Sequence, residues 1–445
     1  MSGSAEQKMI EYIPAIDVFA GPGGLGEGFS ALREANTSPF RIALSVDKDP
    51  TAWKTLSLRC FYRQFQYANR PVPDEYYKHV LDPEGFTRSQ LFKKYPEQSA
   101  AALAEAWNAE LGDKSIESKL AERIKRAIKG HRQWVLIGGP PCQAYSVAGR
   151  SRNKGNEKFS TDPKHFLYRE YLNIIAKHWP TAFVMENVKG LLTSKTEGEM
   201  IFPIIRADLQ NPGKALGGIQ EHTYSLYSFV SEKSPEELEA TDFVIRSEEY
   251  GIPQTRHRVI LLGIRNDVLS PGTAPSTLLP VAEEIPIERV LTLPRLRSGL
   301  SHRATRDDSW QNWKSTLQEA LQASWLQEVD LQVQAEMRDA INHIKSRTRE
   351  LNRTSIGKGH RPQYESKWYW DKNLSIALNH EARTHRQDDI HRYLFAACYA
   401  SALGRSPTLK DFPTKLLPDH DNAHKAVVDG GNFGDRFRVQ RTGRP

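Results

Sequence analysis

The sequence contains very little cysteine, with only Cys60, Cys142 and Cys398 in 445 residues. Three cysteines are too few for a disulfide-stabilised fold, and they lack the paired spacing of a structural zinc site. The chain also has no apolar run of the roughly 18 residues that a membrane helix needs. Its first eight residues are polar and lack the apolar region of a signal peptide. We therefore expect a soluble protein of the reducing cytoplasm, with no metal site and no membrane partner.

The chain has little net charge for its length, with 61 Lys and Arg against 54 Asp and Glu, a formal net charge of +7. This excess agrees with a polyanionic partner but does not establish one. Because 39% of the residues are hydrophobic, the chain can form one large domain and a smaller one, each with its own core.

Short apolar runs separated by polar segments predict alternating strands and helices. The first run, residues 15–19, leads through a glycine-rich turn into a helix-like segment and then into a second strand that ends at Asp47. Later runs begin at Trp134, Ala182 and Arg258. Alternating strands and helices are typical of an open, doubly wound α/β sheet, so we expect an α/β fold with a Rossmann-like sheet.

Two stretches of different composition interrupt this pattern. Residues 60–132 are polar and helix-favouring, so we expect a helical insertion between two sheet strands. Residues 270–286 are rich in Pro, Ser and Thr and predict a domain boundary. The expected organisation is a catalytic domain over residues 10–286 and a smaller, irregular region over residues 287–445.

Cys142 directly follows one of the predicted strands, within the run Pro140, Pro141, Cys142, Gln143. An open α/β sheet binds its ligands at the carboxyl ends of its strands, and the two prolines restrict the backbone that leads to the thiol. A free cysteine is more often a small buried hydrophobe. The flanking glycines and polar residues are poor core sequence, however, so the pattern predicts a reactive, presented thiol.

Four glycines lie between the first strand and the first helix. The spacing of Gly21, Gly23 and Gly26 matches the G-x-G-x-x-G dinucleotide fingerprint, and Asp47 lies where a ribose-binding acid belongs. A nicotinamide cofactor is therefore one alternative, although this motif alone is weak. Asp17 precedes the turn, and a carboxylate there suits a ligand with positive sulfonium and ammonium groups, such as S-adenosylmethionine.

Glu186 and Asn187 leave another predicted strand in the same way that Cys142 leaves its own. In a parallel sheet all three side chains can reach one crevice, which indicates a nucleophile with a neighbouring acid. The structural alternative for Asn187 is the N-cap of the next helix.

Gln254, Arg256 and Arg258 alternate along the chain. On a strand this spacing places all three side chains on one face, where the arginines could bind an anion. A solvated basic face is the alternative.

Four segments resemble, in content and order, the catalytic blocks of the DNA cytosine-5 methyltransferases. They are Asp17-Val-Phe-Ala-Gly-Pro-Gly-Gly-Leu25, Gly139-Pro-Pro-Cys-Gln-Ala-Tyr-Ser146, Glu186-Asn-Val188 and Gln254-Thr-Arg-His-Arg258. The resemblance implies S-adenosylmethionine as methyl donor, double-stranded DNA as substrate and a target-recognition domain after the last block. Many members of this family belong to bacterial restriction-modification systems, which implies a cognate restriction endonuclease as partner.

The resemblance also implies a role for each site residue. Cys142 would add to carbon 6 of a flipped cytosine, Glu186 would bind the ring, and Arg256 and Arg258 would supply an electropositive setting. The residues expected to contact the cofactor are Phe19, Gly21, Gly23, Gly24, Leu25 and Asp47. Those expected to contact the DNA substrate are Gln143, Ser146, Asn187 and Gln254. The acid that reads the adenine amine in this family is not identified, because the helical insertion hides the third strand.

The region after residue 286 is expected to choose the DNA sequence. Residues 344–370 hold seven Lys and Arg against two Glu, together with Tyr364, Trp368, Tyr369 and Trp370. This composition favours contact with phosphates and bases. A solvated basic helix that leads into an aromatic core strand is the open alternative.

The family usually ends with a glutamine-x-glycine-asparagine block that completes the cofactor pocket, and no such run occurs in this sequence. We therefore expect a C-terminally incomplete enzyme that needs a complementing segment. An RNA cytosine-5 methyltransferase and a non-catalytic DNA-binding remnant are the remaining alternatives.

Overall fold

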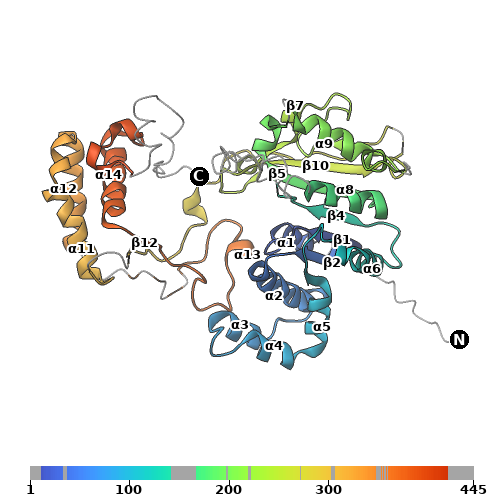
Figure 1. The fold of residues 1–445 in the computed structure, drawn as a ribbon. Helices are drawn as coiled ribbons and strands as arrows, with labels where there is room; N and C mark the ends of the chain where they lie inside the picture. Colours follow the sequence, from blue (N-terminus) through green and yellow to red (C-terminus); the bar gives the residue numbers. More distant parts are fainter. Residues whose placement is uncertain are drawn as a thin grey trace. The chain divides into compact units, whose positions relative to one another are not determined.

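The computed structural model describes residues 12–33, 38–141, 167–196, 199–218, 222–270, 272–301, 306–346 and 359–418, together with Asn352, Thr354 and Gly357. The chain divides into two compact units, Met1–Glu284 and Ile285–Pro445 (Figure 1). Across the described ranges, no helix is both long enough and apolar enough to cross a membrane.

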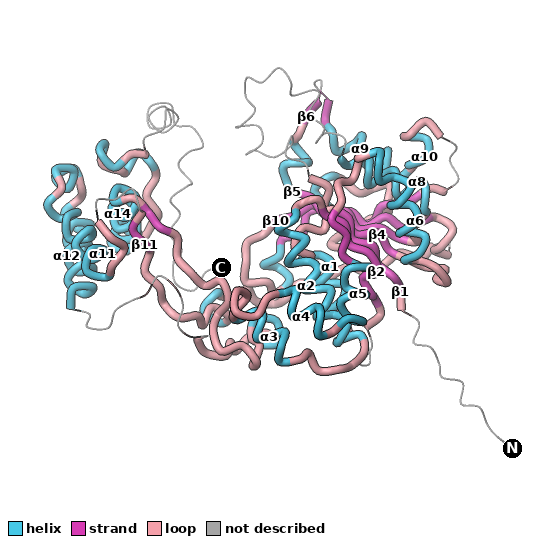
Figure 2. The backbone as a smooth tube through the Cα atoms, turned by 60° about the horizontal axis from the view of Figure 1, so that its bottom comes forward, coloured by secondary structure: helices cyan, strands magenta, loops and turns pink. Residues whose placement is uncertain are grey.

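An eight-stranded sheet forms the centre of the first unit, with the strand order β3-β2-β1-β4-β5-β10-β8 and β9 paired to β10. The strands are β1 (Ile13–Val18), β2 (Phe40–Asp47), β3 (Ala106–Asn108), β4 (Val135–Gly138), β5 (Ala182–Val188), β8 (Tyr224–Tyr227), β9 (Val244–Arg246) and β10 (His257–Arg265). The five strands from β3 to β5 are parallel, whereas β10 runs antiparallel to β5, β8 and β9. Figure 2 shows these strands side by side. The expected Rossmann-like α/β sheet is confirmed.

Helices cover both faces of this sheet (Figure 1). The helices of this unit are α1 (Gly24–Ala31), α2 (Pro50–Tyr67), α3 (Asp74–Leu81), α4 (Arg88–Lys94), α5 (Pro96–Glu105), α6 (Glu117–Ala127), α8 (Leu167–His178), α9 (Ile201–Gln210) and α10 (Pro212–Ala215). Of these, α3 and α4 lie beyond α2 and α5 and do not cover the sheet (Figure 1). Alternation along β1 explains the two layers, because successive side chains point to opposite faces. Ile16 and Val18 pack in one core with residues of α6 and α8, whereas Ala15 packs in another core with residues of α1. Asp17 therefore lies on the α1 side.

The predicted insertion is not wholly helical, since it contains the edge strand β3. Ala106, Trp107 and Asn108 pair in parallel with Ser45, Val46 and Asp47 of β2. Three residues are too few to show a period of two, and the strand follows α5 without a break, so helix-favouring composition concealed it. The expectation of a purely helical stretch over residues 60–132 is wrong at this point.

The second unit has a helical core. Its helices are α11 (Trp310–Glu319), α12 (Leu331–Ser346), α13 (Ser366–Tyr369) and α14 (Gln387–Leu403). Leu317 of α11, Met337 of α12 and Phe395 of α14 belong to one buried cluster. Most of the other described residues in this unit form extended or irregular segments, including the short parallel pair β11 (Gly299–Leu300) and β12 (Thr384–His385).

Candidate active site

The glycine-rich turn joins β1 to α1 through a strained backbone. Phe19 has φ 56°, Gly21 has φ 55° and Gly23 has φ 90°. A positive φ is uncommon for a bulky residue such as phenylalanine, and strained backbone of this kind is concentrated at functional sites. The Ala20 N–H donates to the Val46 carbonyl at 3.1 Å, which ties the turn to the end of β2.

The glycines of this turn face different surroundings. A Cβ added at Gly21 or Gly24 would meet no described atom within 4 Å, whereas a Cβ at Gly23 would lie 2.8 Å from Cδ1 of Leu56 in α2. Leu25 is partly buried against the core beneath α1. Gly21 and Gly24 therefore leave open space that a ligand could fill, while Gly23 permits the close approach of α2.

Asp47 ends β2 beside this turn. Its Oδ2 accepts a hydrogen bond from the Gly21 N–H at 2.7 Å, and its Oδ1 accepts one from the Asp49 N–H at 2.8 Å. A carboxylate offers about four acceptor positions, so the group can also accept hydrogen bonds from ligand hydroxyls. The predicted neighbourhood of Asp47 and the glycine turn is thus present in the fold.

Asp17 lies on the α1 side of β1 and is 1% exposed. Neither of its carboxylate oxygens has a hydrogen-bond partner among the described residues. Burial raises the pKa of Asp17 to about 7, although Arg63 opposes the shift. A buried carboxylate without a partner is costly, so a positive charge nearby would stabilise its ionised form.

Arg63 of α2 is a buried residue behind the turn that sequence reasoning missed. Its Nη1 donates to Glu27 of α1 at 3.1 Å, and its Nη2 donates to Glu105 of α5 at 2.6 Å. Arg63 is 1% exposed and Glu105 is 5% exposed. The arginine therefore joins three helices next to the start of α1, and only their packing brings these charges together.

Glu186 of β5 and Arg258 of β10 form an ion pair, with 2.8 Å between Oε1 and Nε. The two side chains are 30% and 24% exposed, so they are accessible from solvent. A Cβ added at Gly139, which follows β4, would lie 3.1 Å from Oε2 of Glu186. The glycine thus permits the close approach of the β4 exit to the glutamate.

Asn187 is buried, and its side chain also contacts the segment that follows β4. Its Nδ2 donates to the Pro140 carbonyl at 3.3 Å. The N-cap interpretation of Asn187 is wrong, because this residue lies within β5 and the next helical segment has Val188 as its N-cap. Pro140 precedes Cys142 by two residues. Cys142, Gln143 and Ser146 themselves lie outside the described residues.

Gln254 and Arg256 do not share a strand with Arg258, and this prediction is wrong. Strand β10 begins at His257, and both residues are exposed in the turn that precedes it. The Arg256 carbonyl accepts hydrogen bonds from the N–H and the Oγ of Ser247 at 3.2 and 2.7 Å. These bonds continue the contact between β9 and β10. The N–H groups of Gln254 and Arg256 each donate to the carbonyl two residues earlier, at 2.7 and 2.8 Å, which bends the segment. The alternating sequence pattern therefore extended beyond the strand that it resembled.

The end of β3 adds a carboxylate that the sequence did not identify. Glu110 follows β3 and pairs with Lys48 at 2.7 Å, with both side chains more than half exposed. The Ala109 N–H donates to the Asp47 carbonyl at 3.0 Å, which places this segment beside the end of β2. Sequence reasoning missed Glu110 because the short strand β3, which places it, is concealed in helix-favouring sequence.

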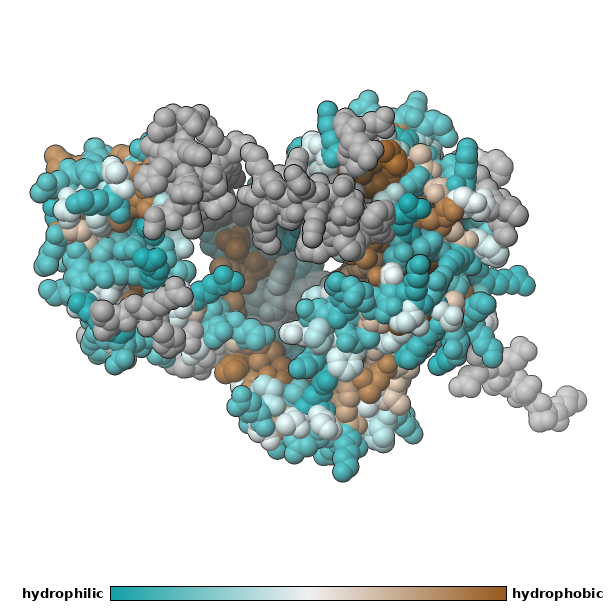
Figure 3. All heavy atoms as spheres, in the orientation of Figure 1, coloured by the Kyte–Doolittle hydropathy of each residue, from teal (hydrophilic) through white to brown (hydrophobic). Residues whose placement is uncertain are grey.

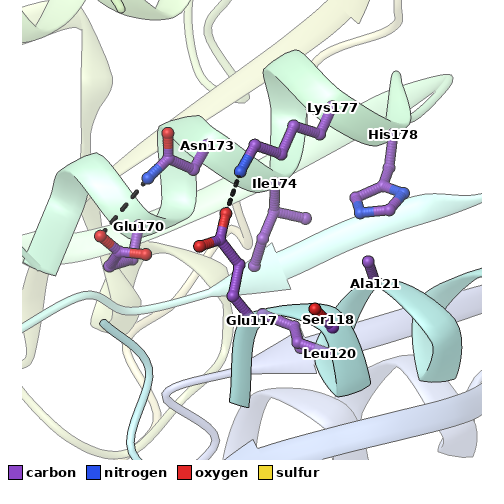
Figure 4. Close-up of a pocket in the computed structure, with 9 residues that line it drawn as sticks. All are labelled: Glu117, Ser118, Leu120, Ala121, Glu170, Asn173, Ile174, Lys177 and His178. Carbon is purple, nitrogen blue, oxygen red and sulfur yellow. Dashed lines mark hydrogen bonds and ion pairs between the residues drawn. The ribbon is translucent and has the colours of Figure 1, made fainter. Parts of the chain in front are cut away.

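A separate pocket of about 250 Å³ lies between α6 and α8, and none of the predicted site residues lines it (Figure 4). Glu117 and Lys177 form an ion pair across it. Burial, with Lys125 and Lys177 nearby, lowers the pKa of His178 to about 4. In the part of the chain that the structure describes, no group of three His, Cys, Asp or Glu residues is placed to hold a metal ion.

The chain is similar in sequence to a known protein family and to several proteins of known activity. A profile of the C-5 cytosine-specific DNA methylases matches residues 92–394. The chain is 31% identical over 265 residues to the type II methyltransferase M.Bpa9945I of Bacillus paralicheniformis, a match that covers 56% of this chain and 53% of that protein. It is 34% identical over 252 residues to the type II methyltransferase M.AquIA of Picosynechococcus sp., which covers 56% of this chain and 71% of that protein.

The chain therefore spans about half the length of M.Bpa9945I. Among solved structures, a methyltransferase of Entamoeba histolytica is similar with a TM-score of 0.35 at 14% identity, over 70% of this chain and 66% of that chain. A similarity at this level supports no further conclusion.

Proposed function

Because the chain belongs to the C-5 cytosine-specific DNA methylase family, we propose that it transfers a methyl group from S-adenosylmethionine to carbon 5 of cytosine in a specific sequence of double-stranded DNA. The observation that carries this proposal is the Glu186–Arg258 ion pair next to the β4 exit. It supports the proposal because the chemistry requires a positioned carboxylate next to the loop of the nucleophile.

The proposed reaction begins with Cys142, because carbon 5 of cytosine is a poor nucleophile. The thiolate forms a bond to carbon 6, and the electrons of the carbon 5–carbon 6 double bond make carbon 5 nucleophilic. Carbon 5 takes the methyl group, loses its proton to a base, and the carbon 6–sulfur bond breaks to release the thiolate. The faces of a stacked base are covered, so the cytosine leaves the duplex first, at a cost of a few kcal/mol.

In the proposed reaction Glu186 binds the cytosine ring, and Arg258 orients Glu186. Arg258 holds Oε1 of Glu186, and Oε2 lies beside Gly139. With a proton on Oε2, the glutamate would donate a hydrogen bond to ring nitrogen 3, and its other oxygen would accept one from the exocyclic amine. Such a contact stabilises the charge that develops on the ring during addition. Arg258 and the exposed Arg256 would supply the electropositive setting that the thiolate of Cys142 needs.

The residues around the glycine turn fit S-adenosylmethionine, whose chemical contribution is an electrophilic methyl group on a sulfonium centre. The open space at Gly21 and Gly24 gives room for it, and the unpartnered carboxylate of Asp17 offers a compensating negative charge. The holding residues would be Phe19, Gly21, Gly23, Gly24, Leu25 and Asp47. Glu110, beside Asp47, is our candidate for the adenine amine.

The biological setting is part of the same proposal. The relatives are type II methyltransferases, which supports a role in a bacterial restriction-modification system with a cognate restriction endonuclease as partner. The DNA of bacteria lies in the cytoplasm, which is the proposed location. That Ile285–Pro445 recognises the target sequence, and that a complementing segment with the glutamine-x-glycine-asparagine block assists the chain, are further predictions.

The test uses duplex DNA in which 5-fluorocytosine replaces cytosine, because fluorine cannot leave carbon 5 as a proton does. With S-adenosylmethionine present, the chain should form a covalent adduct that survives denaturing electrophoresis. Cys142→Ala should abolish the adduct, whereas Cys398→Ala, at a buried cysteine of the second unit, should keep it. An adduct on transfer RNA but not on DNA would favour the RNA enzyme, and DNA binding without methylation would favour the remnant.

A further inference from the structure

The segment over residues 289–301 is bonded to several of the irregular parts of the second unit. On one side it contacts Asn352 and residues 359–364, through bonds from the Arg297 N–H to the Asn352 carbonyl and from the Tyr364 N–H to the Arg289 carbonyl. On the other side it runs parallel to residues 380–385 through β11 and β12. Hydrogen bonds thus hold this segment to a neighbour on each side, which limits its freedom to move.

The contact with residues 359–364 is especially close. Gly359 has φ 76°, and a Cβ there would lie 2.1 Å from the Thr292 carbonyl oxygen. The His360 N–H donates to the same carbonyl at 3.1 Å. The guanidinium of Arg289 lies over the Tyr364 ring, 5.4 Å from its centroid. Residues 359–364 are therefore held against residues 289–292, which fixes the start of the segment that follows.

The short helix α13 follows this base and presents two neighbouring aromatic side chains to solvent. Trp368 is 54% exposed and Tyr369 is 44% exposed, whereas Trp310 and Trp325 of the same unit are 5% and 6% exposed. Glu365, just before the helix, has φ 43°, and a left-handed conformation is strained for a residue other than glycine. The unit therefore buries Trp310 and Trp325, whereas Trp368 follows a strained turn and is exposed.

Charge indicates what covers the two rings. Residues 344–370, which contain them, hold seven Lys and Arg against two Glu. On the face drawn in Figure 3 the described surface is mostly hydrophilic, with smaller hydrophobic areas. Exposed aromatic rings within a basic segment suit a ligand that is both anionic and flat-faced, and nucleic acid bases stack on such rings whatever their sequence.

We propose that Trp368 and Tyr369 form a base-stacking surface that binds the bases of target DNA left exposed when the cytosine leaves the duplex. This proposal rests on the proposed function and adds a binding surface outside the catalytic unit. Extrusion of a base uncovers the faces of its neighbours, and an aromatic ring stacked there would replace the lost contact. The pair would thus favour the flipped state and carry little information about sequence.

The experiment first maps 5-methylcytosine in the DNA of bacteria that express the chain, which gives the recognition sequence. Binding is then measured by fluorescence anisotropy on two duplexes of that sequence, one intact and one with an abasic site in place of the target cytosine. The abasic duplex carries 2-aminopurine next to the gap, because its emission falls when an aromatic ring stacks on it.

Trp368→Ala should weaken binding of the abasic duplex about tenfold and raise the 2-aminopurine emission, while Trp368→Phe should restore most of both. The matched control is Tyr393→Ala, since Tyr393 of α14 is 50% exposed in the same unit, and it should bind as the unsubstituted chain does. The salt dependence of binding should stay the same, because no charge is removed.

Equal effects of Trp368→Ala and Tyr393→Ala, or unchanged 2-aminopurine emission, would overturn the stacking surface while the chain still methylates DNA. Absence of 5-methylcytosine and of DNA binding in the unsubstituted chain would overturn the proposed function as well. A Trp368→Ala chain that binds DNA normally but no longer associates with another protein would assign the rings to a protein partner instead.

Discussion

Arg258 reaches diagonally across two antiparallel strands to Glu186. In the register of β5 and β10, Arg258 lies opposite Val188 and Glu186 lies opposite Ile260, yet Nε of the arginine is 2.8 Å from Oε1 of the glutamate. Diagonal neighbours in a sheet are within reach of long side chains. The pair fixes the orientation of the glutamate before any base arrives.

Arg258→Gln should lower the rate of methyl transfer about 10- to 100-fold, because the glutamate would lose the donor that orients it. Single-turnover methylation with saturating DNA and cofactor measures this effect. Arg246→Gln is the matched control. Arg246 ends the neighbouring strand β9 and makes an exposed ion pair with Glu249. Equal rates for the two variants would show that the diagonal pair has no role in the reaction.

Gly24→Val and Gly23→Val should fail in different ways. At position 24 the new side chain enters open space on the turn, so it should weaken S-adenosylmethionine binding while the melting temperature stays nearly unchanged. At position 23 it would meet Leu56 and a backbone with φ 90°, so it should lower the melting temperature by several degrees. Calorimetric titration and thermal melts separate the two outcomes, and normal cofactor affinity in Gly24→Val would contradict the assignment of the open space.

Asp17 should make the stability of the chain fall as the pH rises. Its pKa is raised from 3.8 to about 7 in the folded state, so the folded state keeps a proton that the unfolded state loses between these values. Over this range the free energy of unfolding should decrease, by up to about 4 kcal/mol, and then level off above the folded pKa. Asp17→Asn should remove this part of the pH dependence, as measured by urea unfolding from about pH 3 to about pH 8, a range that includes both pKa values.

A cationic ligand near Asp17 should favour the ionised carboxylate over the protonated form that the folded chain otherwise keeps up to about pH 7. S-adenosylmethionine would favour the ionised carboxylate, so its binding near pH 6, below the folded pKa, should release a proton. Calorimetry in two buffers of different ionisation enthalpy detects this release. No difference between the buffers, or the same proton release in Asp17→Asn, would contradict charge compensation at this residue.

Arg63→Met should destabilise the first unit by about 3–5 kcal/mol, because it leaves the buried Glu105 without its cation. Arg59→Met offers the matched comparison, since Arg59 also pairs with Glu27 but is 42% exposed. Exposed pairs contribute about 1 kcal/mol or less, so this second variant should unfold nearly as the unsubstituted chain does. If the two variants lost similar amounts of unfolding free energy in urea, the buried ion pair of Arg63 with Glu105 would contribute no more than the exposed pair does.

The fold class and several strand-end residues could be predicted because their signals are local, whereas the order of the strands could not. A short apolar run that stops at glycines, as before Gly139, marks a strand end within a few residues of sequence. Strand β3 gave no such signal, since its three residues continue a helix. The pair Arg63–Glu105 joins residues 42 positions apart, and only the packing of α2 against α5 brings them together. Arg256 was misplaced because alternating residues look the same in a turn as in a strand.

The bonds on both sides of residues 289–301 have a consequence for exchanging parts of the second unit between relatives. A chimaera joined directly after α12 would take residues 289–301 from one parent and their bonded neighbours from the other. The hydrogen bonds that Arg297 and Tyr364 donate would then meet a foreign backbone. Transplanted modules should therefore begin before residue 289 and extend through α14, and shorter grafts should express as aggregates.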